Sequence, residues 1–266
     1  MRPFLFHREH RAWKGGDTRP GNGRPSLVFF THYRCASMML VRRLNDLLAG
    51  LGYRQVDYQG YVHPWPLDQR DHFQRAREEH REVGRFVAEG RFYAPLRYYV
   101  DVPELQNYKV VVVLRDPRDV LVSRYYSEKF AHVRADTRFL AHCEEVEKME
   151  LDEFALAFAD DVGGHYRFFM EHAPDLEHAL FVSYEEVISD FEGFLSKVNE
   201  YAGLGCPAER VREIADKESF RVTSEDKYAH KRSVKARNFE EKLQPETIGA
   251  LNVQLADVLK HFGWEV

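Results

Sequence analysis

Cysteine is scarce in this sequence, and the few cysteines lie far apart. Cys35, Cys143 and Cys206 form no Cys-x-x-Cys pair and show no spacing typical of a metal site. This pattern argues against a disulfide framework and predicts a reducing compartment, the cytoplasm. The histidines and carboxylates also form no cluster in the sequence, so we expect a protein without a metal cofactor.

Long apolar runs and an excess of positive charge are missing as well. No apolar stretch approaches the ~18 residues that a membrane-spanning helix needs, so we expect no membrane span. The formal net charge is −5, which gives no general attraction to nucleic acid. The composition, 44% hydrophobic and 30% charged, is typical of a globular protein, and the oligomeric state is left open.

The first 25 residues contain much Arg, Gly and Pro and only a short apolar stretch. That stretch is too short for the apolar part of a signal peptide. We therefore predict an irregular N-terminal arm over residues 1–25. No repeat and no clear linker follows it, which predicts one domain over residues 26–266.

Apolar patterning predicts strands that alternate with helices. The clearest strand is "KVVVVL" (109–114), whose unbroken aliphatic run is typical of a strand buried on both faces. Because strands and helices alternate, we predict an α/β fold with a doubly wound, mainly parallel sheet flanked by helices. Further strands are expected at 26–30, 53–58, 91–94 and 179–184, and helices from 37, over 67–89, from 117, and over 151–173, 190–205 and 244–264.

The segment "HYRCAS" (32–37) joins the first strand to the first helix. In open α/β sheets, ligands bind at the carboxyl ends of strands, where a helix start offers free N–H groups to an anion. Arg34 supplies a cation, Cys35 and Ala36 are small enough for close backbone approach, and Ser37 brings a hydroxyl. The segment therefore predicts a phosphate or sulfate site, unless Ser37 only caps the helix.

Two familiar anion-binding motifs are absent from this joint. The Gly-x-x-x-x-Gly-Lys-Ser/Thr run of an ATP- or GTP-binding loop does not occur in the chain. A thiol phosphatase using Cys35 would place an arginine at position 41, where Val41 stands.

A second segment, "VVVVLRDPRDVLVSRYYS", contains an arginine at the end of the central strand and a serine in the helix that follows. Asp116 can cap that helix, and Pro117 can occupy its first position. Together with "THYRCASMML", this segment resembles the sulfotransferase family, which uses 3′-phosphoadenosine 5′-phosphosulfate (PAPS) and has a fold like that of P-loop NTPases. The resemblance extends over residues 26–264.

The resemblance implies which residues bind the donor and its product, adenosine 3′,5′-bisphosphate (PAP). The first loop would hold the 5′-phosphosulfate, Arg115 and Ser123 the 3′-phosphate, and Tyr184 ("FVSYEE") one face of the adenine. Phe220 ("KESFRV") would cover the other adenine face, and Arg232 ("HKRSVK") would clamp the 3′-phosphate from a C-terminal lid. The residues implied in the first loop are Arg34, Cys35, Ala36, Ser37 and Met38.

The chain departs from the family pattern in both phosphate-binding segments. The family's first loop most often has lysine, glycine and two threonines, whereas this chain has Arg34, Ala36, Ser37 and Met38. Met38 removes a hydroxyl. The lid segment contains no glycine, so its backbone cannot approach a phosphate in the same way.

The implied reaction moves a sulfuryl group from PAPS to a hydroxyl or amine of a small-molecule, lipid or carbohydrate acceptor. Arg34 would stabilise the charge that develops on the bridging oxygen. A general base is also expected. Tyr93 occupies the position of the histidine used by the family's small-molecule branch, but a tyrosine has an ordinary pKa of about 10. We therefore predict His63 as the base, with Asp57 as an open alternative.

Two other functions remain open from the sequence. A P-loop-like kinase of small metabolites would share the fold and the anion-binding logic, but would need ATP and magnesium. A relative that binds PAPS or PAP without turnover would keep the fold and lose the chemistry.

Overall fold

The computed structural model describes residues 7–13, 20–62, 86–131, 137–218 and 235–264. By internal contacts the chain divides into two compact units, which we treat separately. The first unit comprises Met1–Leu114 and Ala173–Lys217, and the second comprises Arg115–His172 and Glu218–Val266. The division into an arm and one domain over residues 26–266 stays a prediction.

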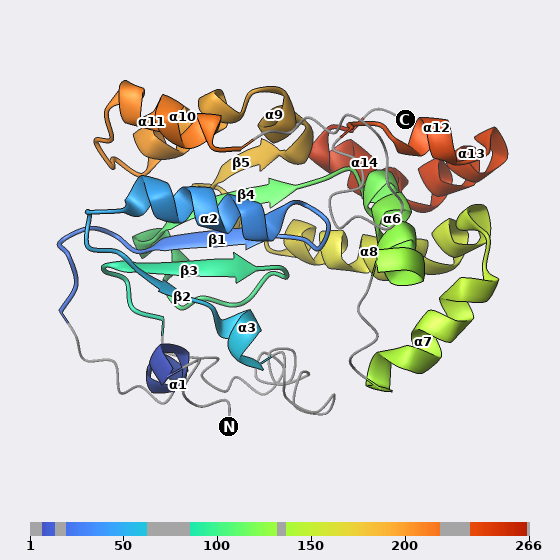
Figure 1. Ribbon diagram of the computed structural model, residues 1–266, viewed down its shortest axis with the longest axis horizontal. Coiled ribbons are helices and arrows are strands. Elements are labelled where there is room, and N and C mark those ends of the chain that lie inside the picture. The colour runs from blue at the N-terminus through green and yellow to red at the C-terminus, as the bar shows by residue number, and fades with distance from the viewer. Residues whose placement is uncertain (1–6, 14–19, 63–85, 132–136, 219–234, 265–266) are drawn as a thin grey trace. The chain divides into compact units, whose positions relative to one another are not determined.

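The first unit contains a parallel sheet with the strand order β2-β3-β1-β4-β5, which confirms the predicted α/β fold (Figure 1). Of the three inner strands, β1 and β4 consist almost entirely of apolar residues and are nearly completely buried, as the sequence pattern predicts. The strands are β1 (Leu27–Thr31), β2 (Arg54–Val56), β3 (Arg91–Leu96), β4 (Lys109–Leu114) and β5 (Leu180–Ser183).

The register of the sheet places the carboxyl ends of its strands at one edge. Phe30 of β1 pairs with Leu96, the last residue of β3, and Leu114 of β4 pairs with Ser183, the last residue of β5. Since all pairs are parallel, the segments that follow β1, β2, β3 and β5 leave the sheet at this same edge. Ligands of open α/β sheets bind at such an edge.

Helix α2 (Ser37–Leu48) packs against β3 and against the helices that follow β5. Its buried leucines recur at helical spacing, while Arg42 is exposed, as expected for a helix with one apolar face. The remaining helices of the unit are α3 (Tyr58–Val62), η1 (Leu105–Asn107), η3 (Ala173–Leu176), α9 (Tyr184–Ser189), α10 (Phe191–Tyr201) and α11 (Ala208–Asp216).

A short helix, α1 (His7–Trp13), lies within the stretch for which we predicted an irregular arm. The prediction is wrong for these residues, because tertiary contacts hold them. Glu9 Oε1 accepts a hydrogen bond of 3.4 Å from the backbone N–H of Asp57, and the His10 ring bonds to the Tyr61 hydroxyl at 2.7 Å. Ala12 is buried.

The second unit is helical in its described residues, and its centre is the long helix α8 (Leu151–Glu171), against which α6, α13 and α14 pack. Residues 244–264, predicted as one helix, form two, because Leu255 leaves the helical conformation between them and both halves then contact α8. The other helices are α6 (Pro117–Tyr126), η2 (Ser127–Ala131), α7 (Thr137–Lys148), α12 (Phe239–Lys242), α13 (Pro245–Gln254) and α14 (Ala256–Phe262).

The predicted start of α6 is confirmed. Asp116 is the N-cap residue and accepts a hydrogen bond from the Arg118 N–H, and Pro117 occupies the first helical position. The helix predicted over 67–89 falls almost entirely outside the described residues. Among the described residues, no helix is both long and apolar enough to span a bilayer.

Candidate functional site

The loop between β1 and α2 makes a tight turn without glycine. Arg34 and Ala36 have left-handed backbones, with φ of 68° and 55°, a conformation that residues other than glycine adopt rarely. A left-handed residue followed by a right-handed one, as at Ala36 and Ser37, turns successive N–H groups to the same side. The loop therefore has the backbone geometry of an anion-binding concavity.

Ser37 does not cap α2, so the simpler interpretation of this serine is wrong. Ala36 occupies the N-cap position and makes no side-chain cap, and Ser37 is the first helical residue. The carbonyl of Ala36 already accepts hydrogen bonds from Met39 and Leu40. This geometry leaves the Ser37 hydroxyl available for another group, the side chain of Arg97.

Arg97, directly after β3, contacts this loop at several points. Its Nε donates to Ser37 Oγ at 3.1 Å and its Nη1 to Gln59 Oε1 at 3.3 Å. Its Nη2 lies 3.1 Å from the Met38 sulfur, and its guanidinium carbon lies 5.2 Å from the centre of the Tyr33 ring. The sequence analysis missed Arg97, although a cation just after a predicted parallel strand was the available signal.

Asp57 follows β2 at the same edge of the sheet. Its Oδ1 accepts a hydrogen bond of 2.7 Å from the Gly60 N–H, which fixes the start of α3. Burial raises the pKa of the Asp57 carboxyl, although the Gly60 bond and the positive charge of Arg97 act in the opposite direction. A carboxylate with a raised pKa is a stronger base than an exposed one.

Two tyrosines with predicted roles are buried in the first unit. Tyr93, in β3, is 1% exposed; its hydroxyl accepts a hydrogen bond of 2.6 Å from the Val87 N–H, and its ring packs against Tyr58. This environment favours a packing role over a catalytic one. Tyr184 begins α9, and the capping box between Ser183 and Glu186 fixes that start. Its predicted contact with adenine stays a prediction.

Three other predicted site residues lie outside the described residues: His63, Phe220 and Arg232. Of the predicted first-loop residues, Cys35 is fully buried, Arg34 and Ala36 belong to the turn itself, and Met38 is 45% exposed. Among the residues that the structure describes, no group of His, Cys, Asp or Glu side chains is arranged to hold a metal ion.

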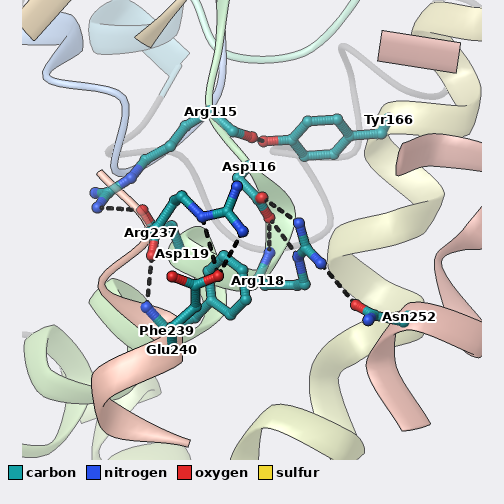
Figure 2. A network of polar contacts seen from close by, with 9 residues as sticks. All are labelled: Arg115, Asp116, Arg118, Asp119, Tyr166, Arg237, Phe239, Glu240 and Asn252. Carbon is teal, nitrogen blue, oxygen red and sulfur yellow. Dashed lines mark hydrogen bonds and ion pairs between the residues drawn. The ribbon is translucent and has the colours of Figure 1, made fainter. Parts of the chain in front are cut away.

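In the second unit, Arg115 belongs to a buried polar network (Figure 2). Its Nη2 lies 3.2 Å from Asp119 Oδ2, and its backbone carbonyl accepts a hydrogen bond of 2.6 Å from the Tyr166 hydroxyl. The other carboxylate oxygen of Asp119 accepts the N–H of Phe239 at 2.9 Å. The network therefore holds the Arg115 guanidinium against the first turn of α6.

A second ion pair fixes the start of α6. Arg118 contacts both carboxylate oxygens of Asp116, at 3.0 and 2.7 Å, and also donates to Asn252 Oδ1 at 2.6 Å. Its guanidinium carbon lies 4.2 Å from the centre of the Phe239 ring. These contacts join α6 to α12 and α13. Sequence reasoning missed Asp119, Phe239 and Asn252, because nothing local to them indicates a distant partner.

Ser123 lies half-buried on α6, four residues after Asp119. Residues at this spacing share one helix face, so Ser123 lies on the side of α6 that carries the Arg115–Asp119 pair. Burial raises the pKa of Asp119, while the adjacent Arg115 guanidinium lowers it. Arg115, which precedes the helix and contacts Asp119, and Ser123, one turn after Asp119, therefore both lie toward the same side of α6.

A family model described as "Sulfotransferase domain" matches residues 91–248, which are more than half of the chain. The chain belongs to the sulfotransferase family. The matched residues include β3, β4, Arg97, Arg115 and Asp119, but not Asn252. No curated protein matches the chain by sequence.

Solved structures show that this family member has the sulfotransferase fold. Mouse sulfotransferase SULT7A1 in complex with PAP is similar with a TM-score of 0.61 at 16% identity, over 89% of this chain and 85% of that one. Retinol dehydratase in complex with retinol and PAP is similar with a TM-score of 0.58 at 15% identity, over 97% of this chain and 86% of that one. The same enzyme in complex with androsterone and PAP is similar with a TM-score of 0.54 at 15% identity, again over 97% of this chain and 86% of that one. At these identities the likeness supports the fold.

Proposed function

We propose that this sulfotransferase moves a sulfuryl group from PAPS to a hydroxyl or amine of a small acceptor and releases PAP. The observation that carries this proposal is the glycine-free turn at Arg34 and Ala36, which combines an anion-binding backbone with two arginines, Arg34 and Arg97. PAPS, when bound, supplies an already activated sulfuryl group, so the protein has mainly to position the reactants and stabilise charge.

In this proposal, the two anionic ends of PAPS are assigned to two groups of residues. The backbone of residues 34–38 would hold the phosphosulfate, and Arg34 would stabilise negative charge there. Arg115 and Ser123 would hold the 3′-phosphate. Arg115 Nη2 contacts Asp119 and the Lys235 carbonyl, and a guanidinium, which has five N–H donors, can bind a phosphate as well. Tyr184, Phe220 and Arg232 complete the proposed nucleotide site.

The general base is proposed to be His63, which directly follows the described end of α3 at Val62. Its ordinary pKa suits proton transfer near neutral pH. Asp57 is the alternative, supported by its place after β2 and by its raised pKa. Tyr93 is the weakest candidate, because its hydroxyl is already hydrogen-bonded inside the core.

The acceptor is proposed to be a hydrophobic alcohol rather than a sugar. The structures of retinol dehydratase were solved with retinol and androsterone, which are hydrophobic alcohols. In this chain, Tyr33 and Tyr98 contact each other edge to face beside Arg97, and Tyr33 is exposed. Such rings suit an apolar acceptor. The cysteine pattern supports a cytoplasmic location.

The function is tested by comparing nucleotide binding with sulfate transfer. We expect PAP to raise the melting temperature more than ADP does, because only PAP carries a 3′-phosphate for Arg115 and Ser123. Radiolabelled PAPS with a panel of hydrophobic alcohols, phenols and sugars should give labelled product, with or without EDTA. Equal shifts with PAP and ADP, or activity that needs magnesium and ATP, would favour a kinase. Binding of PAP without transfer to any acceptor would favour a non-catalytic relative.

A further inference from the structure

Arg97 supplies a positive charge that its described surroundings do not neutralise. The atoms that accept hydrogen bonds from its guanidinium, among the described residues, are the Ser37 hydroxyl, the Gln59 amide oxygen and the Met38 sulfur, all uncharged. Asp57 lies near enough for Arg97 to lower its pKa, but these two residues form no ion pair. The half-buried guanidinium has therefore lost part of its hydration without gaining a direct ion pair with a described residue.

The position of this charge is fixed. The backbone N–H of Arg97 also bonds to Gln59 Oε1, at 3.0 Å, so one amide oxygen holds both the main chain and the side chain. The guanidinium lies over the Tyr33 ring and donates to Ser37, two residues of the loop itself. A fixed, half-buried cation next to a turn with anion-binding backbone geometry is arranged for an anionic partner.

We propose that Arg97 is a second sulfuryl-binding cation, which donates a hydrogen bond to a sulfuryl oxygen of PAPS while Arg34 stabilises the bridging oxygen. This inference rests on the proposed function and deepens it. It also gives a reason for the departures of this loop, since a guanidinium beside Ser37 and Met38 can supply a donor where a hydroxyl is missing.

The test separates PAPS from PAP, because only PAPS carries the sulfuryl group. Dissociation constants of both nucleotides are measured by calorimetry, without acceptor, for the parent protein, Arg97→Ala and Arg97→Lys. We expect Arg97→Ala to weaken PAPS binding about 10-fold or more, the range for a hydrogen bond to a charged group, and to leave PAP binding nearly unchanged. Arg97→Lys should recover part of the lost PAPS affinity, because lysine keeps the positive charge but lacks the several fixed N–H donors of a guanidinium.

Arg24→Ala is the matched control. Arg24 is also a half-buried arginine of the first unit, but it precedes β1 and donates to the Gly203 carbonyl. We expect this variant to bind both nucleotides like the parent protein. Melting curves of all variants establish that they are folded, and if Arg97→Ala is not, Arg97→Gln and Arg97→Lys carry the comparison.

Equal weakening of PAPS and PAP would overturn the inference, because Arg97 would then only shape the loop. Unchanged PAPS binding with a raised acceptor KM would assign Arg97 to the acceptor instead. If the parent protein binds neither nucleotide, the proposed function itself fails. If it binds both and transfers sulfate while Arg97→Ala behaves like Arg24→Ala, the inference alone fails.

Discussion

Arg34 departs from the family pattern at the residue scale but keeps the positive charge of its position. It stands where the family most often has lysine, and its left-handed backbone forms the turn after β1. Its guanidinium keeps the positive charge, although a planar fork is less suited than an ammonium to following one bridging oxygen.

Arg34→Ala should lower kcat far more than it lowers the affinity for PAP. Its proposed partner is charge that develops during transfer, and one such contact is worth on the order of 10²–10³ in rate. Steady-state kinetics and calorimetry with PAP measure the two effects, with Arg34→Lys as the conservative control. A kcat within a few-fold of the parent value would contradict the proposed mechanism.

Three variants identify the general base when their sulfate-transfer rates are compared at saturating PAPS over a series of pH values. We expect His63→Ala to lose at least about 10²-fold in transfer rate, the low end for general-base catalysis, and Tyr93→Phe to lose less. Asp57→Asn is the third variant. The largest loss in Tyr93→Phe would move the base to Tyr93. Mild effects in the first two, with a large loss in Asp57→Asn, would assign it to Asp57.

At the scale of elements, two ion pairs fix the start of α6: Arg115 with Asp119, and Arg118 with Asp116. The Arg115–Asp119 pair is almost fully buried, and the same carboxylate binds the N–H at the start of α12. The pair between Arg167 on α8 and Asp257 on α14 joins two other helices of the unit but is exposed. The Arg115–Asp119 and Arg167–Asp257 pairs have the same chemistry in different environments.

Asp119→Asn should therefore destabilise the protein by about 3–5 kcal/mol, the cost of leaving a buried charge without its partner. The matched control Asp257→Asn should cost about 1 kcal/mol or less, because exposed pairs are screened by water. Urea denaturation measures both free energies of unfolding. Similar losses in the two variants would show that burial of the first pair has no energetic consequence.

Helix α8 contributes a pH dependence through His165. Burial lowers the pKa of this imidazole below its ordinary 6.5, the Asp161 carboxylate opposes the shift, and the Arg124 cation adds to it. Below about pH 6.5 the unfolded chain therefore binds a proton that the folded chain does not. This contribution to stability is complete above the unfolded pKa and is lost as the pH falls toward the folded pKa.

His165→Gln should consequently flatten the pH dependence of stability between about pH 5 and pH 7. The free energy of unfolding of the parent protein should decrease more steeply with falling pH than that of the variant. Urea denaturation at several pH values, with His172→Gln as a control on the same helix's C-terminal end, gives the two slopes. Parallel curves would contradict the assignment.

At the scale of the whole molecule, the boundaries of the family match do not coincide with the boundaries of the two units. The matched residues 91–248 belong partly to the unit with the sheet and partly to the helical unit. Arg34 and Arg97 belong to the first unit, and Arg115 and Ser123 to the second. The family match therefore covers residues of both units.

The sequence by itself determined the class of the fold and most of its strands, and it predicted the two segments that we propose bind anions. Apolar runs such as "KVVVVL", and local signals such as Asp116 before Pro117, depend only on neighbouring residues, so they could be interpreted correctly without a structure. Only the tertiary structure decided that Ser37 binds Arg97 rather than capping α2, that Asp119 holds Arg115 and Phe239, and that His10 of α1 contacts Tyr61 of α3. Most of these contacts join residues that are far apart in the chain. Their geometry depends on strand register and helix packing, which no local sequence pattern specifies.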